Sequence, residues 1–177
     1  MSRSVLLLRA VNVSGRNSVP MARLREVLEE RTELAAVSTY IASGNILCAT
    51  PDDPEAARAT VRRLIAEEFG VDTPVIHRTH AELVATAAAQ PFPDGEARYV
   101  HAMFLEGPPA PGAVAALEQR LVPGERIALV GQDLWIDYAE GGVHSTKLTT
   151  SVLNRALGVA GTARNLRTTQ KLIDLTA

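Results

Sequence analysis

Hydrophobic and polar positions in the first eighty residues alternate between strand-like and helix-like spacing. Ser4–Ala10 is a continuous apolar run too short for a buried helix, so it predicts a central strand. Helical spacing begins at Pro20, and Ser43-Gly44-Asn45 has the composition of a hairpin turn. The predicted elements are a strand over 4–10, a helix over 20–31, strands over 37–41 and 46–50, a helix over 54–69 and a strand over 73–79.

This order of elements predicts a ferredoxin-like (βαββαβ) subdomain of the α+β class. We expect a four-stranded antiparallel sheet in the spatial order 4-1-3-2, with both helices on one face. Pro74 fits the fourth strand, because an edge strand tolerates a missing backbone donor.

The second half of the chain predicts a smaller α+β subdomain that ends in a helical hairpin. Gly131-Gln132-Asp133 separates two alternating runs, which indicates a second β-hairpin. The other predicted elements are helices over 80–89 and 113–121, a strand over 99–105, and two final helices over 146–157 and 165–175 joined by 158–162. We therefore expect domains at 1–79 and 80–177, and we find no internal sequence repeat.

Composition narrows the class of protein. The chain has 177 residues, 46% hydrophobic content and 21% charged content, which excludes a disordered chain. Its single cysteine, Cys48, excludes an intramolecular disulfide and a tetrathiolate zinc site. No apolar run approaches the roughly 20 residues of a membrane span and no secretory signal is visible, so we expect a cytoplasmic protein without a membrane partner.

The net charge of the chain indicates whether it is suited to bind nucleic acid. With 18 Lys and Arg against 20 Asp and Glu, the formal net charge is −2. A dedicated nucleic-acid binder usually carries a basic field, so we expect weak or no binding to duplex DNA at physiological salt.

The first candidate site joins the loop after the first strand to the hairpin turn. In the predicted topology both lie at the same end of the sheet, where glycine turns and a guanidinium suit a phosphate or carboxylate. An alternative is that the amides and glycines satisfy tight backbone angles and tie two turns together. The candidate ligand-binding residues here are Arg9, Asn12, Gly15, Ser43, Gly44 and Asn45.

The C-terminal region supplies three more candidates. Ser145-Thr146-Lys147 lies at a predicted helix start, which favours an anion; the alternative is an ordinary N-cap followed by a solvated lysine. Arg164 and Asn165 open the last predicted helix, as in a helix-turn-helix, although the apolar spacing favours an ordinary helical hairpin.

Signatures of catalysis are missing from the sequence. It contains no GxGxxG, Walker or HExxH motif, and His77 and His80 have no third metal ligand nearby. We therefore assign no catalytic residue, cofactor or metal, and neither a reaction nor an oligomeric state follows from the residues.

Five separate blocks of sequence occur in an order that resembles one bacterial family, the domain of unknown function 1697. They are LLLRAVNVSGRN, TYIASGNI, TKLT, GVAGTARN and QKLIDL, and they span the chain from about Val5 to Leu175. The resemblance implies two α+β subdomains and no established activity. Ala10 and Ser14 stand where the family pattern has glycines, Lys147 lacks the preceding arginine, and Leu166 replaces a tryptophan.

The leading hypothesis is a protein that binds a small anionic ligand, either phosphorylated or nucleotide-like. Two alternatives remain: a nucleic-acid-binding module that uses the C-terminal helix pair, and an enzyme with an interdomain site. A steep dependence of affinity on salt favours the first, and a titratable pair with shifted pKa values favours the second.

Overall fold

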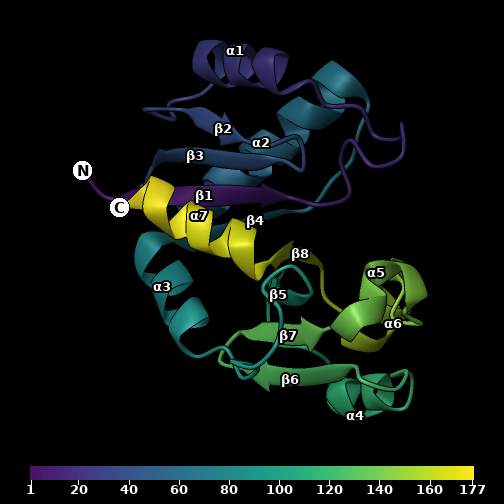
Figure 1. Cartoon of the computed structure of the whole chain (residues 1–177). Coiled ribbons are helices and arrows are strands. Elements are labelled where there is room, and N and C mark those ends of the chain that lie inside the picture. The colour runs from purple at the N-terminus through teal and green to yellow at the C-terminus, as the bar shows by residue number, and fades with distance from the viewer. The chain divides into compact units, whose positions relative to one another are not determined.

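The computed structural model describes all 177 residues, which form an α+β protein of two compact units. The first unit comprises Met1–Leu83 together with Leu172–Ala177, and the second comprises Val84–Lys171. Each unit contains one four-stranded antiparallel sheet (Figure 1). No helix combines the length and the apolar character needed to cross a bilayer.

The first unit has the predicted order of strands. Its elements are β1 (Arg3–Leu8), α1 (Met21–Arg31), β2 (Ser38–Tyr40), β3 (Asn45–Ala49), α2 (Pro54–Phe69), β4 (Val75–Thr79) and the start of α3 (His80–Ala88). The strands lie in the order β2-β3-β1-β4, so β1 is internal and the predicted order 4-1-3-2 is confirmed.

Helices α1 and α2 pack on the same face of this sheet, as predicted. Leu6 and Leu8 of β1 share one buried cluster with Leu24 and Leu28 of α1 and with Leu64 of α2. The predicted limits of α2 are also present: the Asp53 side chain accepts a hydrogen bond from the Ala56 amide at 3.0 Å. Gly70 closes the helix with a left-handed φ of 67°.

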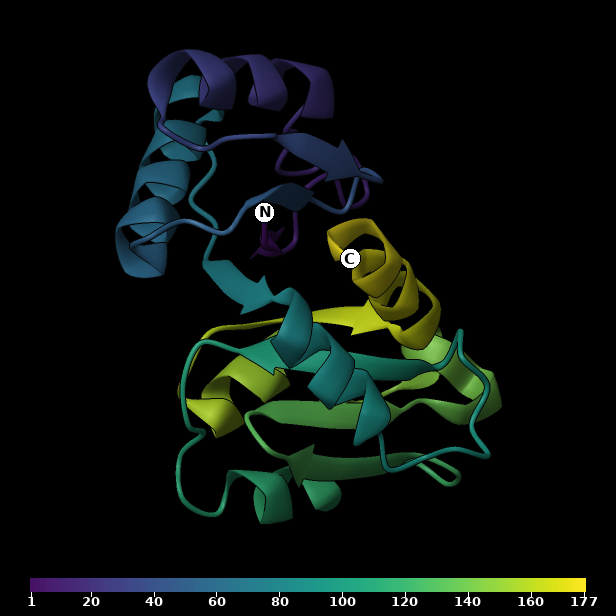
Figure 2. The same cartoon turned by 90° about the vertical axis from the view of Figure 1, so that its left-hand side faces the viewer.

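The second unit places its strands in the order β6-β7-β5-β8, which in Figure 2 runs from β6 at the bottom of the sheet to β8 at its top. Leu134 and Ile136 pack with Leu117 and Leu157 of the helices on one face of the sheet. The elements are β5 (Val100–Leu105), α4 (Ala113–Glu118), β6 (Arg126–Val130), β7 (Asp133–Asp137), the 3-10 turn η1 (Ala139–Gly141), α5 (Gly142–Ser145), α6 (Thr150–Leu157), β8 (Gly161–Asn165) and α7 (Leu166–Thr176).

The predicted C-terminal helical hairpin is wrong. Strand β8 begins inside the segment 158–162, which was predicted as a connector, and runs into the start of the predicted last helix; it pairs antiparallel with β5 from His101↔Asn165 to Leu105↔Gly161. Gly161–Asn165 has no alternation of apolar residues, so its strand conformation follows from a partner distant in sequence rather than from local preference. The helix before it also begins later than predicted, at Thr150, where the Thr149 side chain accepts from the Val152 amide at 3.3 Å.

The two units repeat one topology that the sequence does not show. The strands of each unit are counted here in chain order. In both sheets the second residue of the first strand faces the last residue of the fourth strand, as in Ser4↔Thr79 and His101↔Asn165. In both, the first residue of the third strand faces the fifth residue of the first, as Leu7↔Asn45 and Phe104↔Asp133. Helices α3 and α7 then follow β4 and β8 without an intervening residue.

Candidate functional site

The loop after β1 and the turn before β3 meet, as the topology predicts. The Leu8 amide donates to the Gly44 carbonyl at 2.9 Å, and the Asn12 side-chain amide donates to the Ala42 carbonyl at 2.8 Å. A Cβ at Gly44 would lie 2.8 Å from Leu8 Cβ and 2.9 Å from Val11 Cγ2. Gly44 is therefore required for the close approach of the two segments.

Side-chain amides hold both segments in shape. Asn12 Nδ2 also donates to the Val19 carbonyl at 2.9 Å, and Asn12 Oδ1 accepts from the Val19 amide at 2.8 Å. Asn45 is fully buried, and its Nδ2 donates to the Tyr40 carbonyl at 2.9 Å and to Ser43 Oγ at 3.3 Å. Asn12 and Asn45 thus serve the turns themselves, in line with the alternative interpretation of these residues.

The backbone of Arg9 is fixed by a threonine. Thr73 Oγ1 accepts from the Arg9 amide at 3.0 Å and donates to the Arg9 carbonyl at 2.7 Å. These two hydrogen bonds therefore hold the beginning of the loop beside Thr73, the residue that precedes Pro74.

Left-handed backbone is concentrated in this region. Ala10, Asn12, Ser14 and Asn17 have φ between 50° and 55°, and Ile41 beside the turn has φ 49°. Such values are rare outside glycine and strained for a β-branched residue. Glycine would adopt the φ of Ala10 and Ser14 without the strain that a Cβ causes. Gly15 has φ 72° and open space around its Cα.

A cavity of about 490 Å³ adjoins the loop. Asn12 and Val19 line it from the loop, Pro20, Met21 and Arg25 from the start of α1, and Thr39, Ile41 and Ala42 from the end of β2. Arg25 is its one charged residue; Nη1 donates to Thr39 Oγ1 at 2.6 Å, and the guanidinium makes no ion pair. Helix α1 begins here without a side-chain cap or an acidic residue in its first turn.

Sequence reasoning missed Arg25. Two features of the sequence indicated it. Arg25 lies one turn into the helix that follows the candidate loop, and it is not among the apolar positions that form the buried face of that helix. The six residues that were predicted for this region all lie in the first unit: Arg9, Asn12, Gly15, Ser43, Gly44 and Asn45.

The remaining predicted residues lie in the second unit. Lys147 is exposed in the segment between α5 and α6. Arg164 in β8 is 6% exposed; its Nη1 donates to Thr162 Oγ1 at 2.8 Å and to the Ala163 carbonyl at 2.9 Å, and burial lowers its pKa to about 10. Asn165 caps α7, its Oδ1 accepting from the Thr168 amide at 2.9 Å.

Comparison with known proteins agrees with this architecture. A family model described as a protein of unknown function, DUF1697, matches residues 1–135. The chain belongs to the DUF1697 family.

The DUF1697 chain is also similar to a solved structure, that of the conserved bacterial protein SP0830 from Streptococcus pneumoniae. The two share 23% sequence identity over 99% of each chain, with a TM-score of 0.78, which shows a common fold. No curated protein matches the chain.

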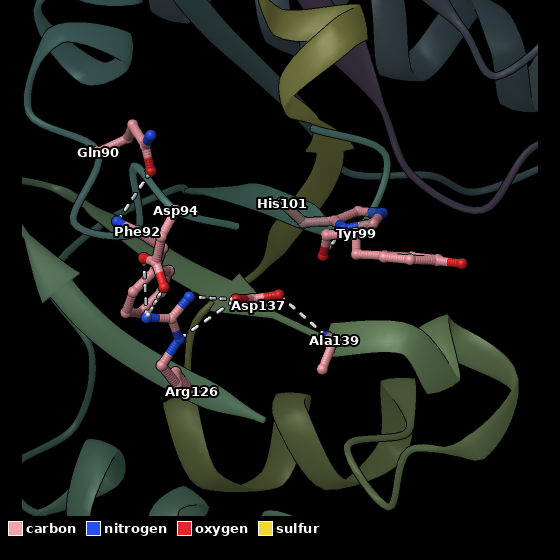
Figure 3. A network of polar contacts seen from close by, with 8 residues as sticks. All are labelled: Gln90, Phe92, Asp94, Tyr99, His101, Arg126, Asp137 and Ala139. Carbon is pink, nitrogen blue, oxygen red and sulfur yellow. Dashed lines mark hydrogen bonds and ion pairs between the residues drawn. The ribbon is translucent and has the colours of Figure 1, made fainter. Parts of the chain in front are cut away.

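A second polar network of this DUF1697 protein lies at the beginning of β6 (Figure 3). Arg126 Nη2 donates to Asp137 Oδ2 at 2.6 Å, and Arg126 Nη1 donates to Asp94 Oδ1 at 3.1 Å. The guanidinium also lies over the Phe92 ring, 4.6 Å from its centroid. Hydrogen bonds to Asp137 and then Asp94 raise the pKa of Arg126, and Arg126 lowers the pKa of Asp94.

This network has a structural role. Asp137 is buried, and its Oδ1 accepts from the Ala139 amide at 2.9 Å. A Cβ at Gly95 would lie 3.0 Å from Asp137 Oδ2, so the loop that carries Asp94 packs directly on the carboxylate. Arg126 lines a cavity of about 320 Å³. Because its guanidinium already bonds to two carboxylates, it is not available to an anion in that cavity.

Burial disfavours the charged form of His101, which lies beside this network. Burial lowers its pKa, and Nδ1 lies 3.0 Å from the Tyr99 carbonyl, which orients the ring. Its ring meets Tyr138 edge to face with centroids 5.0 Å apart, and burial followed by the charge of Glu125 raises the pKa of Tyr138 to about 12. No group of three or more His, Cys, Asp and Glu side chains is arranged to hold a metal ion.

Proposed function

We propose that this protein binds a small anionic ligand, phosphorylated or nucleotide-like, in the cavity at the start of α1. The observation that carries the proposal is Arg25, a cation without a carboxylate partner in a cavity that contains no other charged residue. Several other arginines of the first unit, such as Arg23, Arg31 and Arg62, are paired with carboxylates.

The surroundings of Arg25 suit a negative group. A guanidinium forms charge-assisted, often bidentate hydrogen bonds to phosphate and carboxylate oxygens. The first amides of α1 have no partner within the helix, and the dipole of the helix favours an anion at this end. The volume of about 490 Å³ lies within the usual range of small-molecule sites.

The strained loop supports the same conclusion. Left-handed non-glycine residues cost of order 1–2 kcal/mol each, and such strain tends to collect at binding sites. In this proposal Arg9 and Gly15 belong to the loop whose Asn12 and Val19 line the cavity, while Ser43, Gly44 and Asn45 keep the opposite turn in place. Lys147, Arg164 and Asn165 remain candidates for a separate anion contact in the second unit.

The nucleic-acid alternative has less support, because it required a pair of consecutive helices. Strand β8 separates α6 from α7, so the two helices do not form a helix-turn-helix.

Thermal unfolding in the presence of inorganic phosphate, AMP and ATP tests the proposal. A ligand at 100 times its dissociation constant adds about 2.7 kcal/mol of stability. We expect at least one of these anions to raise the melting temperature, and Arg25→Gln to remove that rise. Arg120→Gln is the matched control, because it removes the same charge from an exposed arginine in the second unit.

Arg9→Ala extends the test to the loop. We expect it to abolish the ligand-induced rise while the ligand-free protein stays within about 1 kcal/mol of wild type, since a partly exposed arginine rarely contributes more. An unchanged melting temperature of the wild type with all three anions, or an undiminished rise in Arg25→Gln, refutes the proposed function.

A further inference from the structure

A second cavity, of about 530 Å³, lies at the other end of α1. Its walls are the segment 31–35 that follows α1, the segment 49–53 that follows β3, and the first two turns of α2. All of these residues belong to the first unit. The two ends of one helix therefore border two separate cavities.

Much of the lining of this cavity is apolar. Leu34 packs against the core cluster of the first unit, and Ala35, Ala49, Ala56 and Ala57 add small apolar surfaces. Small side chains on several sides leave room for a short aliphatic chain, whose burial is favourable by about 0.8 kcal/mol for each methylene group.

The side chains that line the cavity carry a net negative charge. Glu33 and Asp52 line it from opposite connectors, are exposed, and form no ion pair. The cation on its wall, Arg31, is occupied, because its Nη2 lies 2.7 Å from Glu67 Oε2. A positively charged ligand would thus meet two carboxylates without displacing an existing salt bridge.

The ends of helices α1 and α2 also favour a positively charged ligand. The C-terminus of α1 directs its last carbonyls toward this end, which favours a cation. The N-terminus of α2 would favour an anion, but Pro54 has no amide hydrogen, and the amides of Ala56 and Ala57 donate to the Asp53 side chain and carbonyl. The positive end of α2 is therefore largely satisfied within the protein.

Thr50 supplies an independent observation. It lines the cavity, and its Oγ1 is buried without a hydrogen-bond partner. A buried hydroxyl without a partner is unfavourable, and a ligand N–H in the cavity would satisfy it.

We propose that this cavity binds an organic ammonium ion, a primary amine carried on a short aliphatic chain. The ammonium lies between Glu33 and Asp52 and the chain lies along Leu34 and the alanines. This site is independent of the anion site proposed above, since it uses none of the same residues and the opposite ligand charge.

Protein-observed NMR titration of the full chain with hexylamine tests this site. We expect saturable shifts of amides in 32–35 and 49–53, with at least about tenfold weaker binding of hexanoate, which has the same chain and the opposite charge, and of methylamine, which lacks the chain. Titration with Nα-acetyl-lysine methylamide distinguishes the source of the ammonium: tighter binding than hexylamine indicates a peptide lysine, and weaker binding indicates a free amine.

Matched variants locate the binding. Asp52→Asn and Glu33→Gln should each weaken hexylamine binding about two- to fivefold, as expected for one carboxylate in a solvated ion pair. Glu29→Gln, an exposed carboxylate of α1 outside the cavity, should leave the affinity unchanged. Ala56→Leu should weaken binding by filling the cavity without altering its charge. Equal binding of hexanoate, or full affinity in both Asp52→Asn and Ala56→Leu, overturns the proposal.

Discussion

The two units of this protein share a strand order and a register, yet they stabilise equivalent positions differently. Asn45 and Asp133 both begin a third strand and are both buried. Asn45 donates to a carbonyl of its own hairpin, whereas Asp133 accepts from Thr86 Oγ1 at 2.7 Å. The side chain at one position is thus an amide that bonds within its own hairpin, and at the other it is a carboxyl group that accepts from a residue of helix α3.

A second pair of equivalent residues is more alike. Arg78 of β4 and Arg164 of β8 are 5% and 6% exposed. Each donates through Nη1 to the carbonyl of the preceding residue, at 2.8 Å in His77 and 2.9 Å in Ala163. A buried arginine at the same register position in two dissimilar sequences shows that the strand order defines the environment of the position.

The units differ most in their strained segments. The first unit concentrates left-handed residues in the loop after β1 and holds them with side-chain amides. The second unit instead fixes its irregular segment 90–96 with the ion pairs of Arg126. The comparison teaches that one fold can stabilise irregular backbone either by amide hydrogen bonds or by charge.

The largest effect is expected at the contact between loop and turn. Gly44→Ala should lower the free energy of unfolding by about 2–4 kcal/mol, because a strained φ of 86° is combined with a Cβ that overlaps Leu8. Gly15→Ala, with φ 72° and open space, should lower it by only about 1 kcal/mol. Urea denaturation of both variants measures the difference, and equal losses would show that close packing at Gly44 is unimportant.

Asn12→Ala should have the next largest effect. It removes three hydrogen bonds and should lower the free energy of unfolding by about 1–3 kcal/mol. Asn17→Ala is the control in the same loop, since Asn17 has a similar φ but one side-chain hydrogen bond, to the Ala10 carbonyl at 2.9 Å. If chemical denaturation gives the two variants the same stability, the loop does not depend on Asn12.

Relief of backbone strain should stabilise the first unit slightly. Ala10→Gly should raise the free energy of unfolding by about 0.5–1 kcal/mol, because glycine adopts the left-handed φ of 51° without the Cβ penalty. Ala42→Gly, in the adjacent turn but without a positive φ, should instead lower it. Calorimetric melting of both variants checks the opposite signs.

The smallest effect is expected from pH, and it has one source in each unit. Burial lowers the pKa of His77 in the first unit and of His101 in the second. As pH falls below the ordinary histidine pKa of about 6.5, the unfolded chain binds protons first, so stability present at neutral pH decreases. Denaturation between pH 7.5 and 5 should show this decrease, and His101→Gln should make it shallower; an unaltered slope in that variant contradicts the role of His101.

Sequence reasoning predicted the fold best where local signals were strong. The caps at Asp53 and Gly70 and the apolar run of β1 carry their structure in a few adjacent residues, so the first unit followed from them. Strand β8 lacks such a signal, because Gly161–Asn165 becomes a strand only through pairing with β5. The repeat of topology was invisible for the same reason: register, rather than residue identity, is what the units share.

The contact between the loop after β1 and the turn before β3 was predicted, but the hydrogen bonds of the side chains there were not. Topology was sufficient to bring Asn12 and Gly44 together, because chain direction fixes which strand ends meet. It could not show that the amide of Asn12 is used by Val19 and Ala42, nor that Arg25 faces a cavity, since both depend on side-chain placement.

The assignment of Leu172–Ala177 to the first unit affects the order in which the protein is completed during synthesis. Leu172 is fully buried, and Thr176 Oγ1 lies 3.0 Å from Nδ1 of His80. Domains generally fold as they leave the ribosome, beginning with the N-terminal one. Here the first unit stays without its final helical segment until residue 176 has been translated, so the half of the protein made first is finished last.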